Sequence, residues 1–359
     1  MTLPNLLNHA TLALVYAGVL IMLTIGLNMV YSVLKFSNFA HAEWVTMGMF
    51  ASWWFLQILS YILPWDTAHL LNNLFVHAVF GFLIVGIFGI LGEVLVFDRL
   101  RKLKAGLDSA IVASIAIGLI VRNFLAMVFG AYPEPNRAIC PTCTSQPSLP
   151  GFLPDLNNIV TIKLVENDPI FGTQWIRINA SGILIIVTSI AMVLAIDYVF
   201  RHTKFGIAMR ATADSIELAQ VSGVDTRRIV HYTWFLAAGL TGMGAAIYRP
   251  YLTGPFNSLT GLYMLLPFFA VVILGGVGSF RGGIIAAIII AYARQATVVI
   301  FSWFQYPGGL EEILEEHIGF TITFSPGYAD AIPFVILIIV LLIRPRGIAG
   351  SVEATRERV

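Results

Sequence analysis

Ionisable side chains interrupt several apolar runs of this chain. His41 and Glu43 follow the first run, Glu93 lies near the end of another, and Arg122 and Arg294 lie deep within two more. Charge is costly in hydrocarbon, so such residues pair with one another, bind a solute or line a water-filled path. We expect Glu93 to reach water. Arg122 and Arg294 either pair with an acid across a helix interface or line a water-filled cavity, and the sequence leaves both possibilities open.

The segment from Asn28 to Gly48 has the most specific pattern. An apolar run is interrupted by Lys35-Phe-Ser-Asn-Phe-Ala-His-Ala-Glu43 and then resumes. Non-helical backbone at membrane depth is tolerated only when it is buried in protein or lines a water-filled path, and broken helices mark solute sites in transporters. The pattern therefore predicts a broken or re-entrant helix near residues 35–43. The alternative is an ordinary short loop at the surface.

Several kinds of catalytic or binding motif are missing. None of the five lysines follows a glycine, so the chain has no P-loop for nucleotide phosphates. No His-Glu-x-x-His motif is present, and Cys140 and Cys143 alone supply at most half of a zinc site. These two cysteines form either a local disulfide or two free thiols. The glycines of residues 275–283 lack dinucleotide-binding spacing and instead predict a tight turn with close helix contact.

The composition indicates that the segments carrying these residues lie in a membrane. Of 359 residues, 58% are hydrophobic and 11% are charged, against about 25% charged in soluble domains. A helix needs about 20 apolar residues to cross a membrane. We therefore predict an all-α polytopic bundle of about 8–10 transmembrane helices in a single transmembrane domain, residues 1–359. The nine candidate spans lie near 9–34, 44–63, 72–97, 108–131, 179–199, 229–253, 259–277, 283–302 and 326–343.

The positions of the basic residues predict the orientation. Four Lys or Arg lie in residues 99–104, five in the loop 200–228 and four in the tail 344–359, whereas the loops 132–178 and 303–330 hold three and none. Cytoplasmic loops carry the excess of basic residues. The first three segments, and with them the C-terminus, are therefore predicted to be cytoplasmic, and the two remaining loops to be outside. The N-terminus is outside if the first three spans all cross. The net charge of +1 indicates no nucleic-acid partner.

The loop at 200–228 contains a predicted short helix. It ends at Gly223, and Asp214 or Ser215 is its expected N-cap. Such a helix is either a docking element for a partner or simply a solvated loop helix.

Three separated motifs resemble the permease subunits of bacterial and archaeal ABC importers for branched-chain amino acids, especially the Liv-type H subunit. The first is Gly26-Leu-Asn-Met-Val-Tyr-Ser-Val-Leu34 with Asn38-Phe-Ala-His-Ala-Glu43, in which Ala42 replaces the usual glycine. In the second, Glu217, Ala219 and Gly223 fit the E-A-A-x-x-x-G coupling signature, from which Leu218 departs. The third is Leu274-Gly-Gly-Val-Gly-Ser-Phe-Arg-Gly-Gly283 with Arg344-Pro-Arg-Gly-Ile-Ala-Gly350.

The resemblance implies a permease in the cell membrane that hydrolyses no ATP itself and binds no cofactor. It implies a second homologous permease subunit, identical or not, two ATP-binding cassette subunits that use ATP and Mg, and an extracytoplasmic solute-binding protein. By the same resemblance, Asn28, Asn38, His41 and Glu43 belong to the translocation pathway, and Arg210, Glu217, Ala219 and Gly223 contact the ATPases. Urea and short-amide permeases have similar motifs, so these substrates remain an alternative. A stand-alone secondary transporter or channel is the alternative of another class.

Overall fold

A computed structural model of the chain describes residues 3–62, 74–130, 159–168, 172–251, 256–304, 326–344 and 347–349. Cys140 and Cys143, much of the two predicted outer loops and the tail beyond residue 349 lie outside the described residues.

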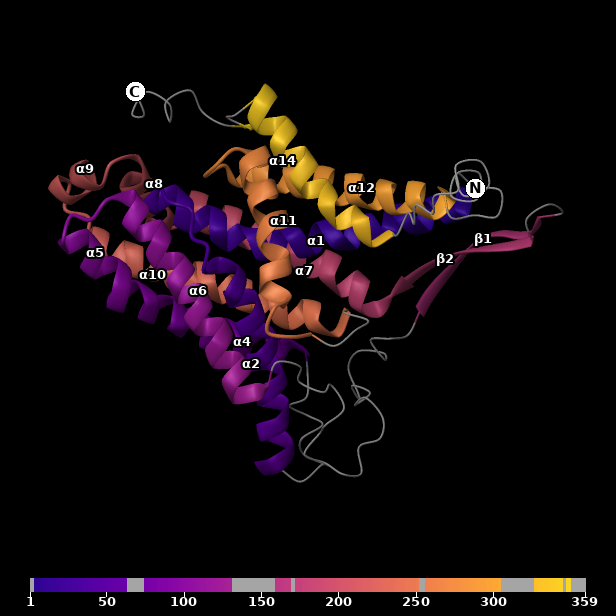
Figure 1. Ribbon diagram of the computed structural model, residues 1–359, viewed down its shortest axis with the longest axis horizontal. Helices are drawn as coiled ribbons and strands as arrows, with labels where there is room; N and C mark the ends of the chain where they lie inside the picture. Colours follow the sequence, from indigo (N-terminus) through magenta and orange to yellow (C-terminus); the bar gives the residue numbers. More distant parts are fainter. Residues whose placement is uncertain are drawn as a thin grey trace, which may run out of the picture.

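The described chain is a bundle of helices, which confirms the predicted all-α architecture (Figure 1). Each of the nine predicted apolar segments contains a helix. In chain order the elements are α1 (Leu3–Leu34), α2 (His41–Ile62), α4 (Leu74–Gly92), the π-turn η1 (Glu93–Phe97), α5 (Asp98–Lys102), α6 (Leu107–Phe129), β1 (Ile159–Asp168), β2 (Gly172–Asn179), α7 (Ala180–His202), α8 (Lys204–Asp214), α9 (Ile216–Val221), α10 (Thr226–Tyr248), η2 (Arg249–Tyr251), α11 (Thr260–Gly275), α12 (Phe280–Phe304), η3 (Pro326–Ala331) and α14 (Ile332–Ile343).

A β-hairpin stands at one end of the bundle, and the sequence did not predict it. Its strands β1 and β2 pair antiparallel from Ile159 opposite Asn179 to Asp168 opposite Gly172. The hairpin extends from the bundle beside the start of α1, and α5, α8 and α9 gather at the opposite end (Figure 1). It falls mostly within the loop 132–178, which the charge pattern predicts to lie outside.

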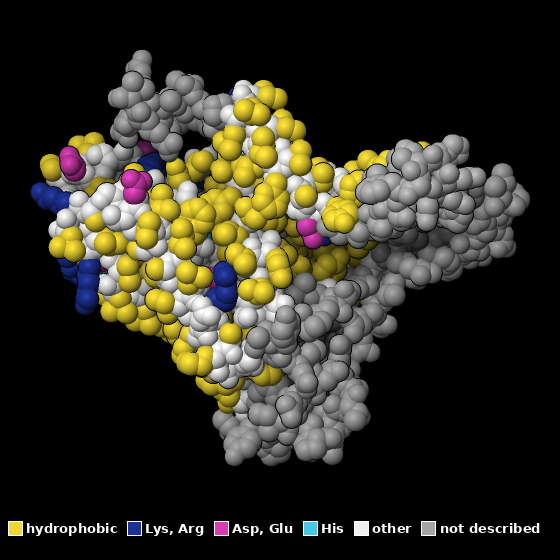
Figure 2. All heavy atoms as spheres, viewed as in Figure 1, with side chains coloured by type: hydrophobic (Ala, Val, Ile, Leu, Met, Phe, Trp, Pro, Cys, Tyr) yellow, Lys and Arg dark blue, Asp and Glu magenta, His cyan; other side chains and the backbone are white. Residues whose placement is uncertain are grey.

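Several helices have the length and composition expected of membrane spans. Among the described residues, five stretches are long and apolar enough to cross a membrane: Leu6–Leu34, Phe75–Lys102, Leu107–Phe129, Ala180–His202 and Phe280–Phe304. The helices α11 and α14 are apolar but shorter. Apolar side chains cover most of the described surface, and charged ones gather mainly at the end with α5, α8 and α9 (Figure 2). This distribution is that of a multi-pass membrane protein.

Helix α10 lies at the centre of the bundle and packs against α1, α2 and α4. Glycines allow the close approach: a Cβ atom on Gly48 of α2 would lie 2.8 Å from the Cα atom of Gly242, and one on Gly242 would lie 2.6 Å from the Val85 side chain of α4. Small residues at helix contacts are the usual means by which helices pack tightly in lipid. Helices α1, α2 and α4 therefore pack closely around α10.

The two glycine-rich parts of the third sequence motif meet in space. A turn joins α11 to α12, and a Cβ atom on Gly275 would lie 2.6 Å from the backbone of Gly282, so the predicted close helix contact is confirmed. Ile348 donates its N–H to the carbonyl of Leu274 at 2.7 Å, and Ala349 donates to Gly275 at 3.2 Å. The chain after α14 thus satisfies the last carbonyls of α11, as helix C-termini require.

The packing of α4 against α10 makes a testable prediction. Replacing Gly242 by valine should lower the free energy of unfolding by about 1–3 kcal/mol, because the added atoms meet Val85 and backbone rather than flexible side-chain ends. Gly92→Ala on α4 is the matched control, since nothing lies within 4 Å of its Cβ position. Thermal unfolding in detergent measures both. Equal stability of the two variants would contradict the tight packing.

Candidate functional site

The predicted break between the first two helices is present. Helix α1 ends at Leu34, Lys35 adopts a left-handed conformation with φ of 58°, and α2 begins only at His41. His41 lies beside Leu23, eleven residues before the end of α1, because its Nε2 atom is 3.0 Å from the Leu23 carbonyl oxygen. Residues 35–40 therefore run back along the last turns of α1 inside the bundle. The interpretation as an ordinary surface loop is wrong.

Side chains alternate along this returning segment as they do in an extended strand. Phe36, Asn38 and Ala40 are buried, whereas Lys35 is exposed and Ser37 is only half-buried. Asn38 starts α2 locally: its Oδ1 atom accepts from the Ala40 N–H at 3.1 Å, and its carbonyl accepts from the His41 N–H at 3.3 Å. Such side-chain to backbone bonds are the usual means by which asparagine forms a turn.

One face of helix α6 covers the break. The Ser114 hydroxyl accepts from the Phe39 N–H at 3.0 Å, Gly118 lies against Ala40 and Glu43, and Arg122 donates to Glu43. These three α6 residues recur every fourth position, which places them on the same side of a helix. On the other side of the break, Phe39 contacts Phe269 of α11, with ring centroids 4.7 Å apart.

His41 joins α2 to both α1 and α10. Its Nε2 atom lies 3.0 Å from the Leu23 carbonyl and 3.0 Å from the Thr241 hydroxyl, which itself donates to the Ala237 carbonyl. Because a carbonyl only accepts, Nε2 must carry the proton in this arrangement. In the neutral ring Nδ1 is then an acceptor, and this buried atom has no partner in the structure.

Two further predicted pathway residues also leave buried polar atoms without partners. The Asn28 Oδ1 and Asn38 Nδ2 atoms are unsatisfied, although the two residues are 5% and 0% exposed. Asn28 lies on α1 against the start of α12, where a Cβ atom on Gly283 would be 2.6 Å from its Nδ2 atom. Most buried polar groups in proteins are hydrogen-bonded. The predicted residues therefore leave two acceptors and one donor available in the interior.

A buried ion pair joins the start of α2 to α6. The Arg122 Nε atom donates to Glu43 Oε1 at 3.0 Å, the Nη2 atom contacts the same oxygen, and Thr46 donates to Oε2 at 3.4 Å. The Glu43 side chain is 2% exposed and that of Arg122 is 18% exposed. Glu43 also lies in the first turn of α2, where the helix dipole favours a negative charge. Of the two possibilities left open for Arg122, the structure therefore shows the pairing with an acid across a helix interface.

Two other ionisable residues are paired as well. Arg294 on α12 donates to Asp330 of η3 at 2.7 Å, and its guanidinium lies 4.8 Å from the ring centre of Tyr16 on α1. The expectation that Glu93 reaches water is wrong. Its side chain is fully buried and contacts Arg101, which reaches back from the end of the helix.

The predicted coupling segment contains two helices, α8 and α9, at the cytoplasmic end proposed from the charge pattern. Ser215 separates them in an extended conformation, and its hydroxyl accepts from the Leu218 N–H at 3.2 Å, which confirms the N-cap. Ala219 is buried, whereas Leu218 and Val221 are 68% and 87% exposed. Helix α9 thus rests on the bundle through its smallest side chain and presents apolar side chains outward.

The remaining coupling residues lie around this helix. Arg210 on α8 and Glu217 on α9 are exposed. Gly223 follows α9 with φ of 84°, donates its N–H to the Gln220 carbonyl at 3.0 Å, and lets Val224 donate to the Ala219 carbonyl at 2.9 Å. This left-handed C-terminal cap explains why glycine stands at this position.

The structure brings Asn38, His41 and Glu43 together at the break and keeps the four coupling residues apart from them at the end of the bundle. The sequence did not single out Ser114, Thr241 or Thr46, which hold the break in place. The spacing of Ser114, Gly118 and Arg122 was the available signal for α6, because three small or polar residues recur on one side of an otherwise apolar helix.

Comparisons with known proteins agree on one family. A family model described as branched-chain amino acid transport system permease component matches residues 10–341. The LivH permease protein of Salmonella typhimurium is 26% identical over 355 residues, which cover 99% of this chain and 97% of the relative. The probable LivH protein of Methanocaldococcus jannaschii is 26% identical over 341 residues, 94% of this chain and 90% of the relative. BraD of Pseudomonas aeruginosa is 24% identical over 360 residues, 99% of this chain and 97% of the relative. No solved structure matches the chain.

The Glu43–Arg122 pair makes a prediction about stability. Arg122→Met leaves a buried carboxylate without its partner and should lower the free energy of unfolding by about 3 kcal/mol, measured by thermal unfolding in detergent. The double variant Glu43→Gln, Arg122→Met removes the unpaired charge and should regain most of that loss. Arg201→Met is the control, because its partner Asp197 is 38% exposed and such surface pairs contribute about 0–1 kcal/mol. A double variant as unstable as Arg122→Met would contradict the prediction.

Proposed function

The chain belongs to the family of branched-chain amino acid transport system permease components, and we propose that it is the membrane subunit of an ATP-driven importer. In this proposal, the chain receives branched-chain amino acids from an extracytoplasmic binding protein and passes them through the cell membrane. Two ATP-binding cassette subunits bind at the cytoplasmic end, and a second homologous permease, identical or not, completes the pathway. ATP and Mg act in the partner subunits, and this chain binds no cofactor.

The exposed face of α9 is the observation that carries the proposal. Ile216, Leu218 and Val221 are exposed on a six-residue helix at the charged end of the bundle. Apolar side chains in this position, surrounded by charged residues, are typical of a protein contact. The absence of any Gly-Lys dipeptide in the sequence supports the same proposal, because the chain then has no phosphate-binding loop of its own.

The translocation pathway is proposed to pass the break at residues 35–43. Unsatisfied atoms of Asn28, Asn38 and His41 are available to hydrogen-bond a solute or water once the pathway opens. The Glu43–Arg122 pair lies at the same break as Asn38 and His41 and supplies one charge of each sign. A zwitterionic amino acid carries the same two charges, so both ends of its backbone would find a complementary group here.

The proposed orientation follows the basic residues. Most Lys and Arg of the charged end lie in α5, in the turn after it and in the segment 201–228, and this supports the proposal that this end and the C-terminus face the cytoplasm. The β-hairpin at the other end is then outside, where the binding protein would dock.

Reconstitution tests the proposed function. The chain, coexpressed with the products of its neighbouring genes, should copurify with an ATPase and take up radiolabelled leucine into proteoliposomes only when ATP is supplied. Binding of leucine, isoleucine, valine and urea by the partner binding protein distinguishes the amino-acid importer from a urea or short-amide importer. Uptake that persists without ATP, from a chain purified alone, would instead identify a secondary transporter or channel.

Gly223 provides a prediction for the docking segment. Gly223→Val should uncouple ATP hydrolysis from leucine uptake, because a β-branched residue at φ of 84° costs about 1–3 kcal/mol and shifts the end of α9. Nothing lies within 4 Å of the Cβ position, so the effect comes from the backbone and not from a clash. Gly223→Asn is the control, since asparagine tolerates this conformation. The measurement is leucine transported per ATP hydrolysed. An unchanged ratio in Gly223→Val would count against the docking role of α9.

A further inference from the structure

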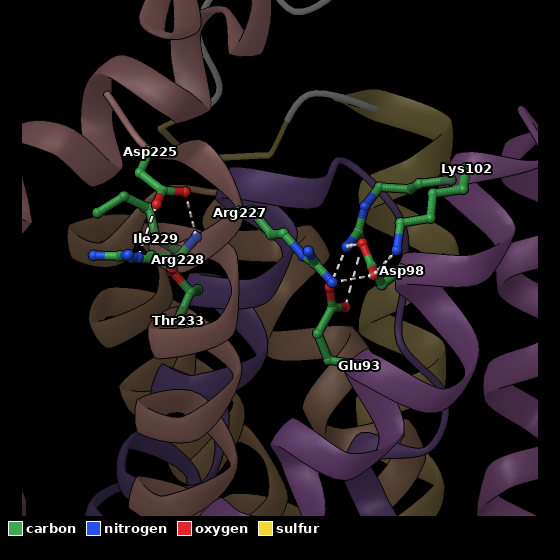
Figure 3. A network of polar contacts seen from close by, with 9 residues as sticks. Glu93, Asp98, Lys102, Asp225, Arg227, Arg228, Ile229 and Thr233 are labelled. Atoms are coloured by element: carbon green, nitrogen blue, oxygen red, sulfur yellow. Dashed lines mark hydrogen bonds and ion pairs between the residues drawn. The ribbon is translucent and has the colours of Figure 1, made fainter. Parts of the chain in front are cut away.

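A network of charged residues connects α10 with the end of α4 (Figure 3). The Asp98 carboxylate, whose side chain is 10% exposed, accepts from Arg227 of α10 at 3.1 Å and from Lys102 at 2.8 Å, and Arg101 lies 3.7 Å from it. Arg101 also binds the buried Glu93 carboxylate through both of its terminal nitrogens. One cation from α10 therefore enters a cluster that otherwise belongs to η1 and α5.

The π-turn η1 explains how Glu93 and Asp98 reach the same cluster. In a regular α-helix of 3.6 residues per turn, side chains five positions apart point about 140° away from each other. In η1 the Asp98 N–H bonds to the Glu93 carbonyl, five residues back, so the turn is wider and brings the two carboxylates to one side. Such π-turns are frequent at functional sites.

The cluster lies next to the coupling segment. The Gln220 side chain at the end of α9 donates to the Thr226 hydroxyl at 2.8 Å, and Thr226 begins α10 directly before Arg227. The Val224 N–H bonds back to Ala219 of α9. A displacement of α9 therefore moves the first turn of α10, where Arg227 holds Asp98.

The last residue of the π-turn touches the break. Phe97, the last residue of η1 and 2% exposed, stacks on Trp234 of α10 at 4.9 Å between ring centres. Its ring centre also lies 5.2 Å from that of Phe36, the first buried residue of the extended segment 35–40. Contacts thus run without interruption from α9 through Arg227, Asp98 and η1 to the segment that carries Asn38, His41 and Glu43.

We propose that the π-turn Glu93–Phe97 transmits movement of α9 to the break at residues 35–43, and that Arg227 is the positioning residue that engages it. The proposal rests on the proposed importer function. Arg227 is 59% exposed, so its bond to Asp98 contributes little to stability in the resting state. Its place at the junction of α10 with η1 gives the bond a role in the transport cycle, because a wider and less regular turn moves more easily than the α-helix on either side of it.

The neighbouring arginine offers a matched control. Arg228 has the same charge and is also exposed, but it pairs with Asp225 in its own first turn at 2.8 Å and forms no ion pair with the described residues of η1 or α5. In the reconstituted importer, Arg227→Gln should lower the leucine transported per ATP hydrolysed by about fivefold. Arg228→Gln should leave that ratio unchanged. Arg227→Lys keeps a single charged contact and should restore most of the ratio.

Phe97→Leu tests the other half of the route without touching a charge. It removes the ring contacts with Phe36 and Trp234 and should also lower the ratio, although the ion pairs remain. Hydrogen exchange of the purified chain in lipid nanodiscs adds a measurement that needs no partner: Arg227→Gln should speed exchange of amides in residues 36–43, and Arg228→Gln should not.

The outcomes separate this proposal from the proposed function. A wild-type complex without ATP-dependent leucine uptake would overturn the proposed function. If the wild type transports and Arg227→Gln lowers hydrolysis and uptake by the same factor, the network is only structural and the inference is wrong. If Arg227→Gln fails to assemble, the leucine transported per ATP hydrolysed is compared in Phe97→Leu and Arg227→Lys. A wild-type ratio in Phe97→Leu overturns the inference. A lowered ratio in Phe97→Leu, together with a wild-type ratio in Arg227→Lys, supports it.

Discussion

Lipid offers no hydrogen bonds, so the extended backbone at residues 35–40 must be satisfied by the protein around it. This constraint accounts for much of the surrounding structure. Ser114 accepts from the Phe39 N–H, Asn38 bonds to the start of α2, and His41 is held between Leu23 and Thr241. Helix α6 is largely exposed on its other faces, yet its one buried face lies against the break and α2. The break is therefore an inner part of the bundle that a whole helix serves to cover.

Not every polar atom in and near this segment has a hydrogen-bond partner. The N–H groups of Lys35, Phe39 and Ala40 and the Glu43 carboxylate have partners. Asn38 and His41 at the break, and Asn28 on α1, each leave one side-chain atom unpaired. An unpaired buried polar atom costs about 1–3 kcal/mol. Two of these atoms lie at the break, and the third lies on α1 against the start of α12. Retaining them is unfavourable for a bundle whose only task is to fold, and it agrees with a site that exchanges partners during a cycle.

The sequence predicted the helices and the break but little of what holds them together. Apolar runs locate helices, because a span needs about 20 apolar residues, and Lys35 to Glu43 interrupt one run visibly. The pairs Arg122–Glu43 and Arg294–Asp330 join residues 79 and 36 positions apart, and such pairings depend on tertiary structure. The π-turn at Glu93 has no compositional signal at all. The β-hairpin was missed because its strands lie in a polar segment between apolar runs.

Helix α10 connects the two candidate sites in two different ways. It carries Arg227 in its first turn, Trp234 in the middle and Thr241 at the His41 contact, so about 21 Å of regular helix separates Arg227 from Thr241. Packed on α4 through glycines, this helix has no irregular turn between the two residues. The π-turn is the irregular element beside it, and it touches Phe36 directly. In the proposed transport cycle, a change of shape at the break would therefore follow the less regular path through η1.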